Sequence, residues 1–381
     1  MKSVILTLAI IVSAGSSVAG VVTISGDNKP DQKLERSLPA DANVTVTLCA
    51  IAGEVSVRGW NKNEVRARSG DAEQIELRRI DLPGQQPTAA KKIDVFINDK
   101  GDDGRPRADC QASADVELDV PKGATVQVQT RDGNISIIGV GAAYAGSQNG
   151  DISIEQVSQK IEAGSIGGTI SVKDSRGRVT LSTAGGGIEA SNIGTVEADD
   201  TFEVISVSGD IQLEKVTHAR LNARSVTGNI TLVGSLAHNG NYVFNTTSGD
   251  MTLTLPPDAS FRLVAKLSHD GEIITDFPLT VTTETLSPEK ASKKAGPKTP
   301  TPAPSAAPTT APTPPSQPKA SPPDNSPPDV TVVRVAPVIK VVTPAIIAAP
   351  YMPRRITGIC GSGDASISVA SFSGTVHLQK N

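Results

Sequence analysis

Residues that could perform acid–base or nucleophilic chemistry are scattered along the 381-residue chain. Each histidine stands alone, without HExxH or paired spacing, so each is expected to be a surface or turn residue rather than a ligand or a base. No G-x-S-x-G elbow occurs, and Tyr144 stands where a dinucleotide loop over residues 139–146 needs its third glycine. The sequence therefore predicts neither a histidine-based triad nor a nucleotide site. The histidines are His218, His238, His269 and His377.

Acidic residues form two patterns that could bind a cation. Residues 99–104 resemble the opening of a calcium loop, but Cys110 occupies the twelfth position, which needs a bidentate glutamate, so a solvated turn is favoured. Asp151, Asp210 and Asp250 could form a ladder along one edge, although the adjacent glycines make turn formation a sufficient explanation. No CxxC or histidine-rich spacing indicates a metal site. We expect no metal and no cofactor.

A carbohydrate-active site needs paired carboxylates and usually aromatic platforms. Asp199 and Asp200 are adjacent in sequence, so strand alternation would turn them to opposite faces. Aromatic residues are also few in this region. A polysaccharide-active enzyme is therefore the least favoured function, and a non-catalytic protein is predicted. The aromatic residues between Ile152 and Met251 are Phe202, Tyr242 and Phe244.

The elements that must position any site come from a short repeat. It consists of a glycine, a small or polar residue, and two β-forming residues separated by one polar residue. Successive copies begin 17–22 residues apart, and a period near 20 is typical of a solenoid or strand array. A degenerate copy begins at Gly187. The regular copies begin at Gly133, Gly150, Gly168, Gly209, Gly228 and Gly249.

Each repeat also contains a second alternating stretch, such as residues 160–163 or 178–181. Apolar residues two apart give each strand one inward face, and the Gly-Asp or Gly-Asn pairs are expected to supply a positive φ at the corner. One unit is thus two short strands and two turns, stable only when stacked on its neighbours. Because the copies keep one phase, we predict an all-β fold, a repetitive β-solenoid, over an antiparallel sandwich or barrel.

The composition agrees with a narrow aliphatic interior. Only ten residues are aromatic, while 34 are glycine. Lys plus Arg number 36 and Asp plus Glu number 40, a net charge of −4, so nothing steers the chain to nucleic acid.

The N-terminus predicts export. Residues 1–19 have a positive start, an apolar core and small residues at the −3 and −1 positions of a cleavage site after Ala19. The apolar core is too short for a membrane anchor, so no transmembrane segment is expected after cleavage, and the location is extracytoplasmic: periplasm, outer surface or secreted. In an oxidising compartment Cys49 and Cys110 can pair, leaving Cys360 free or bound to another chain. Three buried, unbridged thiols are the alternative.

The rest of the chain divides by composition. The alternating stretches of residues 44–130 predict an N-terminal β cap or lead-in sheet, and Trp60 is expected to anchor its core. Proline makes up 14 of the 41 residues from Pro288 to Pro328, which predicts a disordered spacer. The last residues return to the repeat pattern and are expected to form a strand pair that caps the far edge. The predicted segments are the signal peptide 1–19, lead-in 20–43, cap 44–130, repeat domain 131–286, Pro-rich linker 287–329, Pro-interrupted apolar segment 330–356 and C-terminal strand pair 357–381.

A family resemblance rests on two phrases. Gly53–Trp60 reads G-x-V-x-V-x-G-W, and Val120–Ala124 leads into the glycine repeats. Together they resemble a bacterial adhesin-type family of β-strand repeat proteins, a domain of unknown function called DUF4097, over about residues 44–275. The resemblance implies an exported β-repeat protein with an adhesin designation, and it brings no catalytic residues.

The sequence thus favours an exported, non-catalytic adhesin or surface-interaction module, whose partner would be a cell-surface or envelope polymer or protein. The alternative is a periplasmic envelope scaffold or stress-associated component. A polysaccharide-active enzyme on the solenoid comes third.

Overall fold

A computed structural model describes residues 34–70, 72, 74–80, 89–98, 110, 113–268, 271–285 and 354–381. The described residues form 26 strands and no helix. The predicted signal peptide, the Pro-rich linker and most of the apolar segment after it lie outside these ranges.

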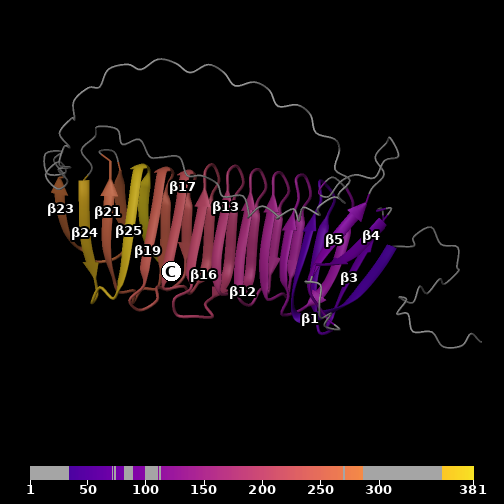
Figure 1. Ribbon diagram of the computed structural model, residues 1–381. Helices are drawn as coiled ribbons and strands as arrows, with labels where there is room; N and C mark the ends of the chain where they lie inside the picture. Colours follow the sequence, from indigo (N-terminus) through magenta and orange to yellow (C-terminus); the bar gives the residue numbers. More distant parts are fainter. Residues whose placement is uncertain are drawn as a thin grey trace, which may run out of the picture. The chain divides into compact units, whose positions relative to one another are not determined.

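The strands form two long ladders, here called sheet A and sheet B, and the strands of each ladder follow one another across Figure 1. Sheet A contains β2 (Val55–Trp60), β3 (Glu64–Ser69), β6 (Val116–Pro121), β8 (Ile135–Ile138), β10 (Ile152–Glu155), β12 (Ile170–Arg176), β14 (Ile188–Gly194), β16 (Ile211–Val216), β18 (Ile230–Val233), β20 (Met251–Leu255), β22 (Glu272–Thr275) and β26 (Thr375–Lys380). Sheet B contains β1 (Leu34–Cys49), β4 (Gln74–Arg79), β5 (Ala90–Asn98), β7 (Thr125–Gln129), β9 (Ala142–Ser147), β11 (Lys160–Ser165), β13 (Arg178–Thr183), β15 (Thr201–Ser206), β17 (Arg220–Thr227), β19 (Asn241–Ser248), β21 (Phe261–Leu267), β23 (Thr280–Thr285), β24 (Arg354–Cys360) and β25 (Ala365–Ser373).

In the middle of the chain, each rung of the solenoid is one strand of each sheet. The pairing is parallel and keeps the repeat in register, so that Ile152 pairs with Ile135 on one side and with Ile170 on the other. Inward residues therefore stack in columns that are almost fully buried, and outward residues form polar columns. The parallel β-solenoid predicted from the repeat is confirmed, with two strands and two turns in each unit.

The glycine corners hold adjacent rungs close together. A Cβ built on Gly168 would lie 2.1 Å from the carbonyl oxygen of Gly150, and one on Gly150 would lie 2.0 Å from that of Gly133. The expected positive φ is wrong for most of the predicted corners, since among them only Gly249 adopts one. Glycine is needed because the backbone of the previous rung occupies the space of a side chain. In the degenerate copy this position is Gly186, not Gly187.

Left-handed backbone occurs instead where the chain leaves sheet A. In four successive rungs, the non-glycine residue at the same position adopts this left-handed conformation. It lets the chain turn toward sheet B while the strand pairing continues. These residues are Gln156, Asp174, Asn192 and Lys215, with φ of 55°, 48°, 57° and 52°.

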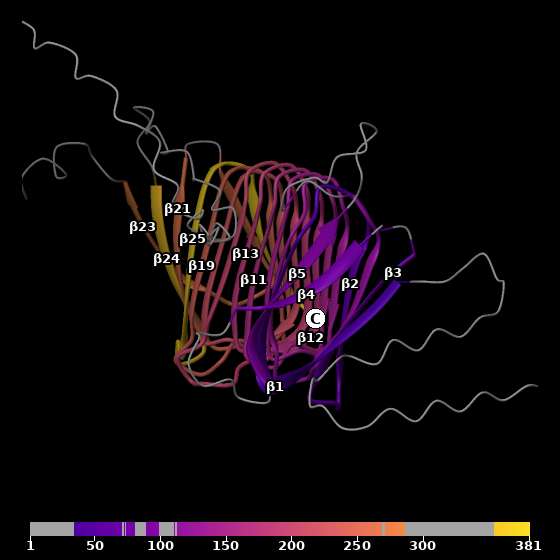
Figure 2. The same cartoon turned by 45° about the vertical axis from the view of Figure 1, so that its right-hand side comes forward.

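The N-terminal end mixes parallel and antiparallel strands. β1 joins the two sheets, because residues 34–39 pair antiparallel with β3 in sheet A and residues 45–49 pair parallel with β7 in sheet B. The outer edges are residues 34–39 of β1 in sheet A, which lie beyond β3, and antiparallel β4 in sheet B (Figure 2). The parallel ladders begin before residue 131, since β2 pairs with β8 and β7 with β9. The predicted boundary between the cap (44–130) and the repeat domain (131–286) therefore does not coincide with a change in strand pairing.

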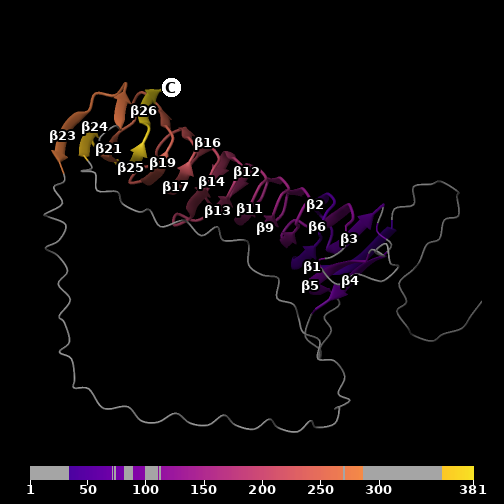
Figure 3. The same cartoon turned by 90° about the horizontal axis from the view of Figure 1, so that it is seen from above.

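The C-terminal strands fill a gap inside the solenoid rather than capping its far edge. β25 pairs with β19 on one side and β21 on the other, and β26 lies between β20 and β22. These strands lie among rungs that precede them by about a hundred residues (Figure 3). Ile367 stacks between Tyr242 and Leu263, so the last residues complete the buried column. The far edge is instead formed by β22 in sheet A and by β24 and β23 in sheet B.

Candidate functional site

Each of the corner acids accepts a hydrogen bond from a backbone amide of the next rung. Asp151 accepts the N–H of Thr169 at 2.7 Å, and Asp210 accepts that of Asn229 at 2.8 Å. Asp250 accepts the N–H of Thr375 at 2.7 Å. The three carboxylates therefore satisfy the first amide of the next rung. No group of three or more His, Cys, Asp or Glu side chains suited to a metal occurs in the part of the chain that the structure describes.

A row of buried hydroxyls supports the glycine corners from inside. Ser165 accepts the N–H of Gly168 at 2.9 Å and donates to the carbonyl of Gly150 at 3.3 Å. Ser147 accepts the N–H of Gly150 at 2.8 Å. Both serines are fully buried, so they fix the turn rather than act as nucleophiles.

His218 does not lie on the surface, contrary to the sequence prediction. It is completely buried beside Phe202, and its Nε2 lies 2.8 Å from the carbonyl oxygen of Gly177, while Nδ1 is buried without a hydrogen bond. Burial lowers the pKa of His218, although the Gly177 carbonyl and the charge of Asp200 oppose that change. The imidazole is thus a neutral part of the core. His238 is exposed, His377 lies on the outer face of sheet A, and His269 is outside the described residues.

The adjacent carboxylates of Asp199 and Asp200 diverge, as strand alternation predicted, although they lie in a turn. Asp200 is buried and accepts the N–H groups of Val196 and Glu197 at 2.8 and 2.9 Å. Burial alone would raise the pKa of Asp200, but these two hydrogen bonds outweigh it and lower the pKa. Asp199 is exposed and lies 4.0 Å from Arg178. The two residues do not form a catalytic pair.

Phe202, Tyr242 and Phe244 lie in the core and offer no platform for a sugar.

Trp60 is not a core anchor. It is only partly buried, its indole N–H donates to the Glu64 carbonyl at 2.8 Å, and the cations of Lys62 and Arg66 each lie 4.7 Å from its ring centre. It covers the turn between β2 and β3 from outside, because its indole N–H and its ring face both have partners there.

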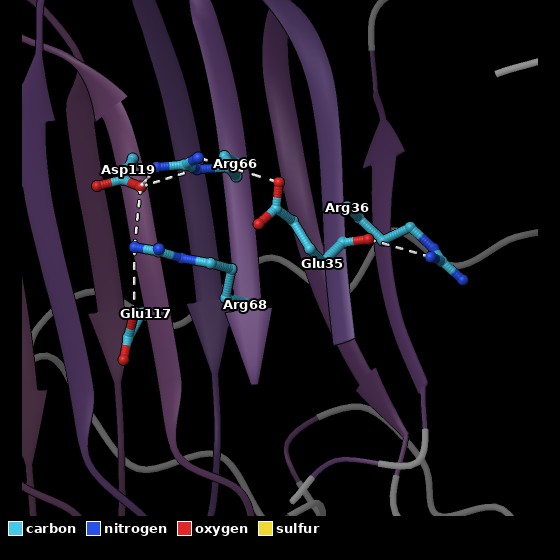
Figure 4. A network of polar contacts seen from close by, with 6 residues as sticks. All are labelled: Glu35, Arg36, Arg66, Arg68, Glu117 and Asp119. Atoms are coloured by element: carbon cyan, nitrogen blue, oxygen red, sulfur yellow. Dashed lines mark hydrogen bonds and ion pairs between the residues drawn. The ribbon is translucent and has the colours of Figure 1, made fainter. Parts of the chain in front are cut away.

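Arg66 connects Trp60 to an ionic network on the outer side of β3 and β6 (Figure 4). Its guanidinium donates twice to one oxygen of Asp119, at 3.0 and 2.6 Å, and Arg68 donates to the same oxygen at 3.1 Å. Glu117 and Glu35 bind the two arginines from either side. The hydrogen bond to Asp119 raises the pKa of Arg66. The network fastens an antiparallel strand to the parallel edge, which is a structural role.

The cysteines are divided between the two ends. Cys49, the last residue of β1, is joined to Cys110 by a disulfide. Cys360 is a buried free thiol at the end of β24, 3.5 Å from the Ala259 carbonyl. The calcium-like segment 99–104 lies outside the described residues.

The outer faces of the two sheets differ in charge. From β8 to β22, the strands of sheet A carry four basic and five acidic residues. The basic ones are Lys173, Arg176, Lys215 and Lys380, and the acidic ones are Glu155, Asp174, Glu189, Glu214 and Glu272. From β7 to β24, the strands of sheet B carry seven basic and two acidic residues among the described side chains. The basic ones are Lys160, Arg178, Arg220, Arg224, Arg262, Lys266 and Arg355, and the acidic ones are Glu162 and Glu203. The outer face of sheet B is therefore the candidate interaction surface.

Sequence reasoning missed this surface because the basic residues are far apart along the chain. Arg220 and Arg262 are 42 positions apart. The signal was present in the alternation, since both residues flank the inward positions of a strand, but only the register of the strands places them on one face.

The fold is that of a two-sheeted parallel β-solenoid with a C-terminal rung inserted out of chain order. The profile of the Toastrack DUF4097 family matches residues 61–300, more than half of the sequence, and the chain belongs to this family. No curated protein matches the chain. Among the residues described, no helix is long and apolar enough to cross a membrane.

One similar solved structure is a 1.95 Å crystal structure described as a "putative cell adhesion protein" from Clostridium sporogenes. It shares 9% sequence identity with a TM-score of 0.18, and the alignment covers 92% of this chain and all of that one. A TM-score this low does not define a shared fold, so membership of the family rests on the profile match.

Proposed function

We propose that this chain is an exported, non-catalytic interaction module of adhesin type, which presents the outer face of its solenoid to a partner at the cell envelope or cell surface. The observation that carries the proposal is the continuous parallel ladder of sheet B. Its inward residues are fixed by packing, whereas its outward residues form a regular, solvent-facing surface with an excess of positive charge.

Export is supported by the Cys49–Cys110 disulfide, because such bonds persist in oxidising compartments and are rare in the cytosol. It agrees with the signal peptide predicted over residues 1–19.

The test is fractionation of cells that express the full chain, combined with protease added to intact cells. We expect the mature protein in the envelope or medium, with both cysteines resistant to alkylation until a reductant is added. A variant that lacks residues 1–19 is the matched control, and it should stay cytosolic with reactive thiols. A protein that is wholly periplasmic and protected from protease would favour an envelope scaffold instead, and a cytosolic full-length chain would overturn export.

A further inference from the structure

Four cations mark the corners of a rectangle on the outer face of sheet B. Arg220 and Arg224 lie on β17, and Arg262 and Lys266 lie on β21. All four side chains are exposed. In sheet B, β17 and β21 are separated by β19 and β25, so the arrangement exists only because the C-terminal strand is inserted between them.

The register places the four cations opposite one another. Two residues four positions apart on a strand are about 13 Å apart, and three ladder steps span about 14 Å. The cations therefore form a nearly square frame, with a neutral floor between them. The two framing rows are Arg220, Asn241, Ser366 and Arg262, and Arg224, Asn245, Ala370 and Lys266. The row between them is Asn222, Val243, Ser368 and Val264.

The cations of the frame are poorly neutralised by the protein. Arg224 donates to the Asn222 side chain at 3.2 Å, and Arg220 donates to the backbone carbonyl of Asp199. Within the described ranges, Arg262 and Lys266 form no ion pair. The nearest acidic residues are Glu203, beside Asn222, Asp364, just before β25, and Asp199, whose carboxylate lies 4.0 Å from Arg178; all three lie outside the frame.

Spacing and charge together suit a ligand with several separate anionic groups. At physiological salt the Debye length is about 8 Å, so cations about 13 Å apart scarcely repel one another, and each can pair with its own anion. The floor offers amide and hydroxyl groups from Asn241, Asn245, Ser366 and Ser368, which both donate and accept hydrogen bonds. A chain of sugars presents the same two features, hydroxyl groups throughout and acidic groups at intervals.

We propose that this frame, here called the basic frame and made of Arg220, Arg224, Arg262 and Lys266, binds an anionic polysaccharide along the outer face of sheet B. The proposal rests on the proposed function and names the chemistry of its partner. Phe372, which is 48% exposed and follows Ala370 on the same face, adds an aromatic surface at the Lys266 end of the frame. Although Val243 and Val264 also lie in the floor, its amide and hydroxyl groups favour a sugar polymer over a lipid surface, which would gain little from them.

The experiment measures binding of the full mature chain to dextran sulfate, polygalacturonate and neutral dextran by isothermal titration calorimetry at physiological salt. Arg262→Gln/Lys266→Gln removes two cations from the frame. Lys173→Gln/Lys215→Gln removes two exposed cations from sheet A and is the matched control, since both variants change the net charge equally. Circular dichroism and the thermal unfolding midpoint establish that each variant is folded. Sedimentation with phosphatidylglycerol vesicles tests a membrane surface as the alternative.

We expect both polyanions to bind, neutral dextran not to bind, and the frame variant to weaken binding about tenfold because two exposed ion pairs are lost. The sheet A variant should bind within about twofold of the parent. The proposal is overturned if neither polyanion binds, if the two variants lose affinity equally, if neither loses affinity, or if the vesicles bind and the polyanions do not. Surface proteolysis is a separate readout, so a surface-exposed protein without polyanion binding would refute the frame and leave the proposed function standing.

Discussion

The middle of the solenoid and its two ends use the same strand geometry but obtain their contacts differently. From β9 to β18, each strand pairs with the strand one unit earlier and one unit later in the chain. At the ends, partners are distant: β1 pairs with β7, and β19 pairs with β25. Local repetition is therefore enough to build the middle, whereas the ends need long-range closure, a disulfide and an ionic network. The following predictions test that division.

The largest effect is expected from truncation after Leu286, which removes β24, β25 and β26. Ile367, Val369, Val376 and Leu378 are fully or almost fully buried, and each contributes roughly 1.5–3 kcal/mol. The loss would also separate β21 and β22 from the rest of the solenoid. We expect the shortened chain to lose cooperative unfolding or to self-associate, as measured by denaturant titration and analytical ultracentrifugation. A monomer as stable as the full chain would show that the inserted rung is dispensable.

The second effect concerns the N-terminal end. Cys49→Ala opens a disulfide that bridges 61 positions, and the free energy of unfolding should fall by about 4 kcal/mol because the unfolded chain regains the entropy of that loop. Chemical denaturation without reductant measures the change. Cys110→Ala and the double variant should lose the same amount as Cys49→Ala. Additive losses would mean that the two side chains act separately and that the bond does not hold this end.

The third effect tests the middle. Gly168→Val should lower the free energy of unfolding by roughly 3 kcal/mol, since the new side chain meets the backbone of the previous rung. Gly146→Ala is the control, because a Cβ there would lie 3.8 Å from its nearest neighbour, the Gln129 side chain. Denaturant unfolding should leave this control within about 0.5 kcal/mol of the parent. Equal losses in the two variants would contradict the close-contact explanation of the corners.

The smallest effect is a pH dependence of the free energy of unfolding that arises from His218 in the middle of the solenoid. Burial lowers the pKa of His218, so its contribution to stability is complete above the unfolded pKa of about 6.5 and is lost as pH falls through the folded pKa. Between pH 7 and 5 the free energy of unfolding should decrease, and it should decrease less in His218→Gln. His377→Gln, on the outer face, should follow the parent. If the parent and both variants had identical pH profiles, the pH dependence of stability would have to arise from a group other than His218.

The repeat allowed the solenoid and its inward residues to be predicted, since alternation such as Ile152-Ser153-Ile154 is a local property of a strand. The role of the corner glycines was predicted for the wrong reason, because the contact with the previous rung is not visible in a single unit. His218 was misplaced, since its neighbours Gly177 and Phe202 belong to other rungs. Trp60 was predicted to anchor the core of the cap, but nearby Lys62 and Arg66 provide partners outside the core.

The repeat, the inward side chains and the aliphatic interior can be derived from the residues alone, because these properties follow from spacing within about 20 residues. The order of the rungs and the place of the last strands depend on contacts between distant segments, which are seen only in the folded chain. β25 lies between β19 and β21 because the gap there exposes two buried columns that only a further strand can cover. That same insertion sets the distance between β17 and β21, and with it the spacing of the basic frame.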